Sequence, residues 1–291
     1  MAYDAAQHSI VLFGGLPLPS RMTNDTWVWN GRAWSQLHPA SSPPALQGSM
    51  VYDAASQQVI LLLSQVQSGG IVANEQWAWD GTTWHQLHPS TLPEVIGASM
   101  VYDAARQQIV LFGGGVPNGH LVTYMNATWT WDGATWQQRQ PAMAPQPRAG
   151  AAMAYDSARQ QVVLYGGTGP TGAFTDTWVW DGTTWQQQHP ALMPPARQQT
   201  QMVYDDATRQ TTLFSGISAT NQEPLSDTWT WNGATWTQLA DQGAPEALYE
   251  SAAYDSDQQA IVVYAAPGAG KTAPSASQTW LWNGSAWTLW G

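Results

Sequence analysis

Apolar and polar residues follow the same order six times along the chain. Each repeat begins with a short apolar segment ending in Tyr-Asp, as at residues 49–53, and after a polar turn continues with an apolar run, as at residues 109–112. A variable loop leads to a Trp-x-Trp segment, a turn with Gly, and a last segment that begins with a third Trp. Short β-branched and aromatic runs bounded by Gly and turn residues are typical of strands. Each repeat therefore predicts four short antiparallel strands and no helix.

The Trp-x-Trp segments define the period of the repeat, which is 49 to 52 residues. Asn-Gly or Asp-Gly follows the second Trp in every copy, as at Asn30-Gly31 and Asp80-Gly81. These dipeptides accept the positive φ angles of a tight hairpin. The first Trp of each copy is Trp27, Trp77, Trp129, Trp178, Trp229 and Trp280.

The hairpin at each Gly turn has two possible registers. A two-residue loop places Trp27 opposite Trp34, whereas a four-residue loop places Trp29 opposite Trp34. Both registers keep the three Trp side chains on one face, because side chains alternate with period two along a strand. Eighteen of the nineteen Trp residues belong to this repeat, so we expect them to pack in the core.

Six units of four antiparallel strands predict an all-β, six-bladed β-propeller. We expect a single domain over residues 1–291, with blades at roughly 1–40, 41–90, 91–142, 143–191, 192–241 and 242–291. Every blade is complete within its own segment. Closure of the ring is therefore expected to depend on side-chain packing between the first and last blades.

The Phe-Gly-Gly pattern, with a lone Trp after the next turn, resembles kelch repeats. It occurs at Phe13-Gly14-Gly15, Phe112-Gly113-Gly114 and Tyr165-Gly166-Gly167, and the Asp-Thr-Trp-x-Trp-Asp-Gly units resemble a bacterial kelch type. The resemblance spans the whole chain and implies a kelch-like propeller. Blades two, five and six have Leu63-Ser64, Ser215-Gly216 and Ala265-Ala266 instead, so we expect them to pack or bend differently.

The kelch resemblance leaves the function open, because one fold serves many functions. Kelch propellers include peptide-binding and actin-binding modules, sugar mutarotases and the core of galactose-oxidase-like enzymes. The last of these use a Cys-modified Tyr, and this chain has no Cys.

The net charge of −11 arises largely from turn residues. Twelve of the twenty acidic residues stand in Tyr-Asp pairs, before Thr-Trp, or in the Trp-Asp-Gly turns, where Asp bonds its own backbone. Lys271 is the only lysine. Nucleic acids and anionic membranes require clustered Lys and Arg, so we expect neither as a partner.

The chain shows no sign of a membrane span or of export. No run of about 18 apolar residues occurs, and no signal segment precedes the first repeat. We expect a monomer in the cytoplasm, or an extracytoplasmic protein if a leader or flanking domain is missing from this sequence.

Candidate binding residues lie in the segments that the kelch resemblance places at one mouth of the ring. Arg148 and Arg197 stand seven residues before the Tyr of their blades, where that family often has Arg, and the corresponding residues elsewhere are Ala45, Val95 and Ala247. A symmetric scaffold that varies at one position is typical of a binding funnel. The longest loop, at residues 115–125, adds further candidates. Besides the two Arg residues, the expected rim comprises Gln47, Glu94, His120, Tyr124, Gln199, Glu246, Tyr249 and Glu250.

The sequence assigns no catalytic residue, metal or cofactor. His-Glu-x-x-His and Gly-x-Ser-x-Gly are absent. His38, His88 and His189 occupy one repeat position, which in adjacent blades is too far apart for a shared metal. Residues 265–272 resemble a phosphate loop but lack its first Gly and a following helix, so we expect no nucleotide.

These observations predict a non-catalytic binding scaffold that presents a central funnel and loop rim to a protein, peptide or glycan. The first alternative is a carbohydrate-active enzyme of the mutarotase kind that uses Arg148, Arg197, Glu94 or His120. The second is a recently amplified repeat scaffold with no specific ligand. The rim residues could then be ordinary solvated loop residues.

Overall fold

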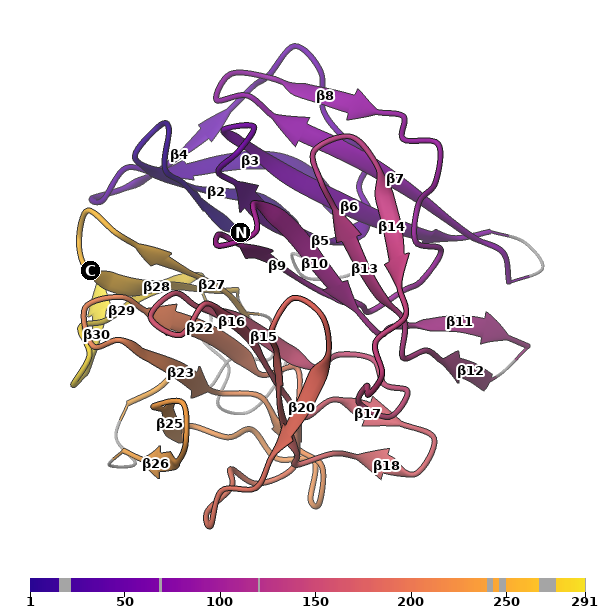
Figure 1. Ribbon diagram of the computed structural model, residues 1–291. Coiled ribbons are helices and arrows are strands. Elements are labelled where there is room, and N and C mark those ends of the chain that lie inside the picture. Colours follow the sequence, from indigo (N-terminus) through magenta and orange to yellow (C-terminus); the bar gives the residue numbers. More distant parts are fainter. Residues whose placement is uncertain are drawn as a thin grey trace.

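The computed structural model is all-β and contains no helix in the residues that it describes, which are 1–15, 22–67, 70–119, 121–239, 243–245, 250–266 and 276–290. These residues form six four-stranded antiparallel sheets, which follow one another around a ring (Figure 1). The predicted six-bladed β-propeller is thereby confirmed. The described part of the chain has no helix of the length and apolarity that a membrane crossing requires.

Each blade is one continuous stretch of chain, and its strands lie in chain order across the sheet. Blade 1 contains β1 (Ala2–Asp4), β2 (Ser9–Gly15), β3 (Thr23–Trp29) and β4 (Trp34–Leu37). Blade 2 contains β5 (Gln47–Asp53), β6 (Gln58–Val66), β7 (Val72–Trp79) and β8 (Trp84–Leu87). Blade 3 contains β9 (Ser99–Asp103), β10 (Gln108–Phe112), β13 (Thr128–Trp131) and β14 (Trp136–Arg139).

The second half of the ring repeats this plan. Blade 4 contains β15 (Ala152–Asp156), β16 (Gln161–Tyr165), β19 (Thr177–Trp180) and β20 (Trp185–Gln188). Blade 5 contains β22 (Gln201–Asp205), β23 (Gln210–Phe214), β25 (Thr228–Trp231) and β26 (Trp236–Gln238). Blade 6 contains β27 (Glu250–Asp255), β28 (Ala260–Ala265), β29 (Gln278–Trp282) and β30 (Trp287–Trp290).

Three two-stranded antiparallel sheets lie at one end of the described blades. Two are hairpins inside the loops between second and third strands, and one of these, in blade 3, projects from the ring (Figure 1). We call this end the loop face, because it also carries the links between blades. These sheets are β11 (Gly115–Asn118) with β12 (Leu121–Tyr124), β17 (Thr168–Gly169) with β18 (Gly172–Ala173), and β21 (Arg197–Gln198) with β24 (Ile217–Ser218).

The first strand of every blade lies innermost. Each first strand contacts the first strand of the next blade, and β27 contacts β1 to close the circle. Ile10 and Trp29 of blade 1 pack there with Ala253 and Val262 of blade 6. Since both of these sheets are complete within their own segments, the ring closes by packing, as the sequence predicts.

The Gly turns adopt the four-residue register. Trp29 lies directly opposite Trp34, and their ring centroids are 5.6 Å apart. The Asn30 side chain accepts hydrogen bonds from the backbone N–H of Arg32 and of Ala33, both at 3.0 Å. Gly31 has a φ of 90°, which explains why Gly occupies this place.

The third Trp of each repeat joins its blade to the preceding one. Its indole Nε1 donates a hydrogen bond of 2.8 to 2.9 Å to the residue just before the Trp-x-Trp segment of that neighbour. In the described residues the pairs are Trp34 with Thr279, Trp84 with Thr26, Trp136 with Gln76, Trp185 with Thr128, Trp236 with Thr177, and Trp287 with Thr228.

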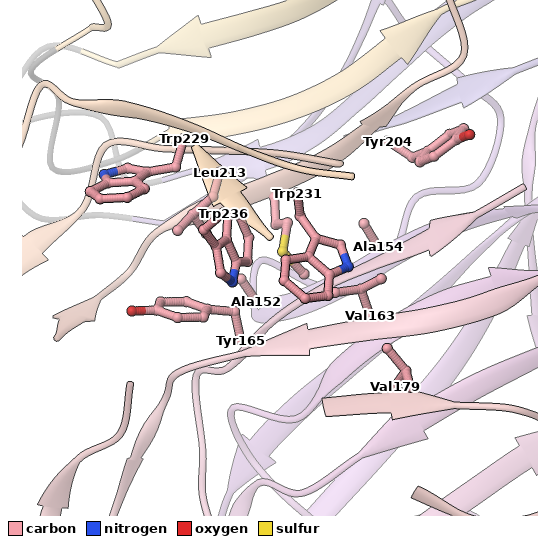
Figure 2. Close-up of a cluster of buried hydrophobic side chains, with 11 residues drawn as sticks. Ala152, Ala154, Val163, Tyr165, Val179, Tyr204, Leu213, Trp229, Trp231 and Trp236 are labelled. Carbon is pink, nitrogen blue, oxygen red and sulfur yellow. The ribbon is translucent and has the colours of Figure 1, made fainter. Parts of the chain in front are cut away.

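The hydrophobic core lies between blades rather than at the axis. Figure 2 shows the cluster between blades 4 and 5, where Tyr165 lies beside Trp236 and Val163 lies near Trp231. The Tyr165 and Trp236 rings meet edge to face at 5.4 Å, a favourable geometry for aromatic pairs. The expectation that the repeat Trp residues pack in the core is therefore confirmed here.

The departures from the double glycine affect the blades unequally. In blade 3, Gly113 and Gly114 have φ angles of 73° and 90°, and β10 ends before them. In blade 2, β6 continues through Leu63 and Ser64 to Val66, without such a break. Blade 6 extends β28 to Ala265. In blade 5 the expectation of a different bend is wrong. Ser215 takes a φ of 57°, and the second strand ends before it at Phe214, as it ends before Gly113 in blade 3.

Candidate functional site

Arg148 is completely buried beside β15 and forms an ion pair within blade 4. Its Nη2 donates to Asp176 Oδ2 at 2.8 Å, and its Nη1 donates to the Gly166 carbonyl at 2.9 Å. Its Nε donates to the Gln146 carbonyl at 3.0 Å. The guanidinium also lies 3.9 Å from the centre of the Phe174 ring.

Arg197 repeats this arrangement in blade 5 and is equally buried. Its Nη1 and Nη2 donate to the two oxygens of Asp227 at 2.7 and 2.6 Å. Nη1 also donates to the Ser215 carbonyl at 3.1 Å, and Nε donates to Pro195 at 3.2 Å. We call each of these pairs, Arg148–Asp176 and Arg197–Asp227, an Arg–Asp clamp.

The clamps are charged on both sides. Burial opposes ionisation of Asp176 and Asp227, but hydrogen bonds from the Arg partner and from a Trp indole, together with the positive charge, hold the pKa of each carboxyl below its usual value. The indole donors are Trp178 and Trp229, each at 2.7 Å. A ligand could contact either guanidinium directly only after the clamp had opened.

Blades 2 and 3 lack both partners of the clamp. Blade 2 has Ala45 at the Arg position and Glu75 at the Asp position, and blade 3 has Val95 and Ala127. Arg and Asp are thus present together or replaced together in these four blades. The sequence pattern predicts that the Asp before Thr-Trp bonds its own backbone in a turn. For Asp176 and Asp227 this prediction is wrong about the main partner, because each carboxylate accepts hydrogen bonds from an Arg.

A cavity of about 420 Å³ opens on the loop face where these clamps are missing. The start of β5, the end of β6 and the segment before β9 form its walls, and the residue before β3 contributes an edge. We call it the blade 2–3 cavity. Its apolar lining comprises Met22, Leu46, Leu62, Val66, Val95 and Ile96.

Three polar side chains at or near the blade 2–3 cavity donate to backbone carbonyls, whereas the Oδ1 oxygen of one of them, Asn74, is buried without a partner. Ser64 Oγ donates to the Val95 carbonyl at 3.1 Å, and Asn74 Nδ2 donates to the same carbonyl at 3.1 Å. Ser49 Oγ donates to the Ala98 carbonyl at 3.2 Å. These bonds tie blade 2 to the link before blade 3. Among the residues that the structure describes, the lining contains no charged side chain.

Exposed apolar side chains occur both in the cavity lining, at Met22 and Val66, and on neighbouring loops of the loop face. Ile71 is 61% exposed and Leu121 is 74% exposed, and both lie between the second and third strands of their blades. The two loops meet, since a Cβ added to Gly70 would lie 3.3 Å from the Pro117 carbonyl oxygen. We call the following set the apolar rim: Met22, Val66, Ile71, Leu121 and Val122.

The arrangement offers no metal centre among the residues described, where no group of three or more His, Asp and Glu side chains could hold an ion. Comparison with known proteins adds no identity. No protein-family model matches this chain. No curated protein sequence matches it either. The propeller fold is thus shown by the structure, whereas the kelch-type identity and the bacterial origin stay predictions.

The structure gathers only part of the expected rim at one place. Gln47 lines the blade 2–3 cavity, and exposed Glu94 directly precedes Val95 in its wall. Gln199 is exposed in blade 5 with a φ of 54°. Half-buried Tyr124 ends β12, beside the apolar rim.

The remaining expected rim residues cannot be placed in the same way. His120, Glu246 and Tyr249 lie outside the described residues, and Glu250 is described by its backbone alone, as the first residue of β27. The apolar rim was not among the predicted binding residues, which were charged, polar or aromatic. Its signal was the presence of Ile71, Leu121 and Val122 in loops where solvated residues are usual.

Proposed function

We propose that this propeller is a non-catalytic interaction scaffold that binds a protein or peptide on its loop face, at the blade 2–3 cavity. One observation carries the proposal. Blades 4 and 5 are closed by Arg–Asp clamps, whereas the clamp-free blades 2 and 3 hold a cavity of about 420 Å³. That volume lies within the range of about 300–1,000 Å³ typical of ligand sites.

Catalysis is the weaker candidate for this site. An enzyme needs an acid and a base that converge on one pocket, and the described residues that line the blade 2–3 cavity include no charged side chain. The mutarotase-like alternative would use Arg148, Arg197, Glu94 or His120. Both guanidinium groups are engaged with carboxylates, and His120 lies outside the described residues. A bare amplified scaffold is also disfavoured, because the blades differ where the cavity lies.

A peptide fits the cavity better than a glycan does. A glycan presents many hydroxyl groups, each of which loses free energy when it is buried without a partner. Ser49, Ser64 and Asn74 already donate to protein carbonyls. An apolar side chain would instead gain from the walls formed by Leu62, Val95 and Ile96. The kelch-like resemblance accords with this choice, since that family includes peptide-binding modules.

A selection from a random twelve-residue peptide library, displayed on phage and presented to the whole chain, tests the proposed function. We expect enriched peptides whose binding is lost when Ile71→Asp and Leu121→Asp place charges in the apolar rim. The matched control is Leu192→Asp with Met143→Asp, because these two residues are also exposed but lie in the links around blade 4. No enrichment, or peptides that bind the rim variant and the parent protein equally, would refute a peptide-binding loop face.

A further inference from the structure

We infer that the blade 2–3 cavity accepts one large apolar side chain of an extended peptide and that Glu94 selects a Lys or Arg next to it. The inference rests on the proposed function and narrows the ligand of the same site. The apolar residues Val95 and Ile96 and the acidic residue Glu94, all in the link before blade 3, would have different roles in binding. The cavity wall around Val95 and Ile96 supplies affinity, and the exposed carboxylate of Glu94 supplies a preference of charge.

The walls favour a single apolar side chain. Val95 is 6% exposed and Leu62 is 4% exposed, and both belong to one packed hydrophobic cluster, so this part of the wall is firmly held. The backbone of Ile96 is fixed by paired hydrogen bonds with Gly115, both at 2.9 Å. A rigid apolar wall loses little conformational freedom on binding, which favours affinity.

The charge preference follows from the acids near the cavity. Glu75 is already engaged, because its carboxylate accepts hydrogen bonds from the Trp77 indole at 3.0 Å and from Gln86 at 3.3 Å. Glu94 is exposed and forms no ion pair within the described part of the chain. A cationic side chain beside the buried apolar one would meet this carboxylate, whereas an acidic side chain would be repelled.

Both Arg–Asp clamps strengthen this charge argument. Arg148 and Arg197 are each paired with an Asp of the same blade. They therefore offer little attraction to an anionic ligand.

The test uses the peptides enriched from the random twelve-residue library and measures their affinity by fluorescence anisotropy. We expect these peptides to share a Leu, Met, Phe or Trp adjacent to a Lys or Arg. Ile96→Glu should weaken binding by about tenfold or more, because it places a charge against the apolar side chain. Gln47→Trp should also weaken binding by about tenfold or more, because the Trp side chain fills the cavity. Gln47 is exposed, so this second variant keeps the test valid if Ile96→Glu fails to fold.

Glu94→Lys tests the charge preference separately. It should weaken binding by about threefold, in keeping with an exposed ion pair, and should abolish the decrease in affinity on adding salt. Glu223→Lys is the matched control, since Glu223 is exposed on the loop of blade 5, and it should leave affinity unchanged.

The outcomes separate this inference from the proposed function. Peptides that no longer bind the variant with Ile71→Asp and Leu121→Asp, but still bind Ile96→Glu and Gln47→Trp, would overturn the inference. The proposed function as a binding scaffold would then still hold. Enrichment of acidic peptides would also overturn it. Absence of any enriched peptide, or indifference to the rim variant, would overturn both.

Discussion

Trp34 of blade 1 donates a 2.9 Å hydrogen bond from its indole Nε1 to Thr279 Oγ1 of blade 6. The two residues are 245 positions apart, yet their contact is the same as the one that joins Trp185 to Thr128 between blades 4 and 3. No strand is shared between the first and last sheets. The ring is therefore closed by the ordinary contact between blades, repeated once more.

Replacing the Thr acceptor should destabilise the propeller at either place. Thr128→Val leaves the buried Trp185 indole without a partner and should reduce the free energy of unfolding by about 1–3 kcal/mol. Thr279→Val should cost about 1 kcal/mol, since Trp34 is only half buried and water can replace the lost acceptor. Urea unfolding monitored by Trp fluorescence measures both. Exposed Thr237→Val is the control, and parent-like midpoints for all three variants would contradict the role of this bond.

The Arg197–Asp227 clamp should behave as a buried ion pair. Arg197→Met leaves the carboxylate of Asp227, whose side chain is 10% exposed, without its positive partner. Removing one member of such a pair costs about 3–5 kcal/mol. The double variant Arg197→Met with Asp227→Leu should recover part of that loss, because it removes the stranded charge. A double-mutant cycle in urea measures the coupling, with exposed Arg32→Met as the control, and an additive cycle would refute the clamp.

The same pair predicts an acid dependence of stability. The pKa of Asp227 is lowered in the folded protein, so its contribution is fully present above the unfolded value of about 3.9 and is lost as the pH falls through the folded pKa. In Arg197→Met, burial without the Arg should raise that pKa. The stability difference between parent and variant should therefore shrink as the pH falls from 7 to 3. Unfolding series at fixed ionic strength would show this, and a constant difference would be the contrary result.

The sequence predicts local structure well here because the decisive residues are close together in the chain. Trp29 and Asn30-Gly31 specify a hairpin within one segment, although pattern alone left its register open between two choices. Arg148 and Asp176 are 28 residues apart, and only the folded blade shows that the guanidinium is buried against that carboxylate. The blade 2–3 cavity was harder still to predict from the sequence, because it depends on missing features. Ala45 replaces the Arg of the clamp, and Leu63 replaces the first Gly of the double glycine.

Two Gly turns provide a matched test of contact between blades. Gly133 and Gly182 have φ angles of 95° and 97°, so Ala imposes the same backbone strain at both. A Cβ at Gly133 would meet nothing within 4 Å, whereas one at Gly182 would overlap Arg106 of blade 3. Arg106 lies there because its Nη1 pairs with Asp103 at 2.9 Å and donates to the Gln160 carbonyl at 3.1 Å.

Gly182→Ala should therefore be less stable than Gly133→Ala by about 1 kcal/mol, at the low end of overpacking penalties because the Arg106 side chain can move. Thermal and urea unfolding of the two variants measure this difference. Adding Arg106→Ala to each should make the two Ala variants equally stable, since the overlap is then removed and only the backbone strain remains. A stability difference that persists without Arg106 would mean that the turns differ for another reason. It would contradict the proposed contact between Arg106 of blade 3 and Gly182 of blade 4.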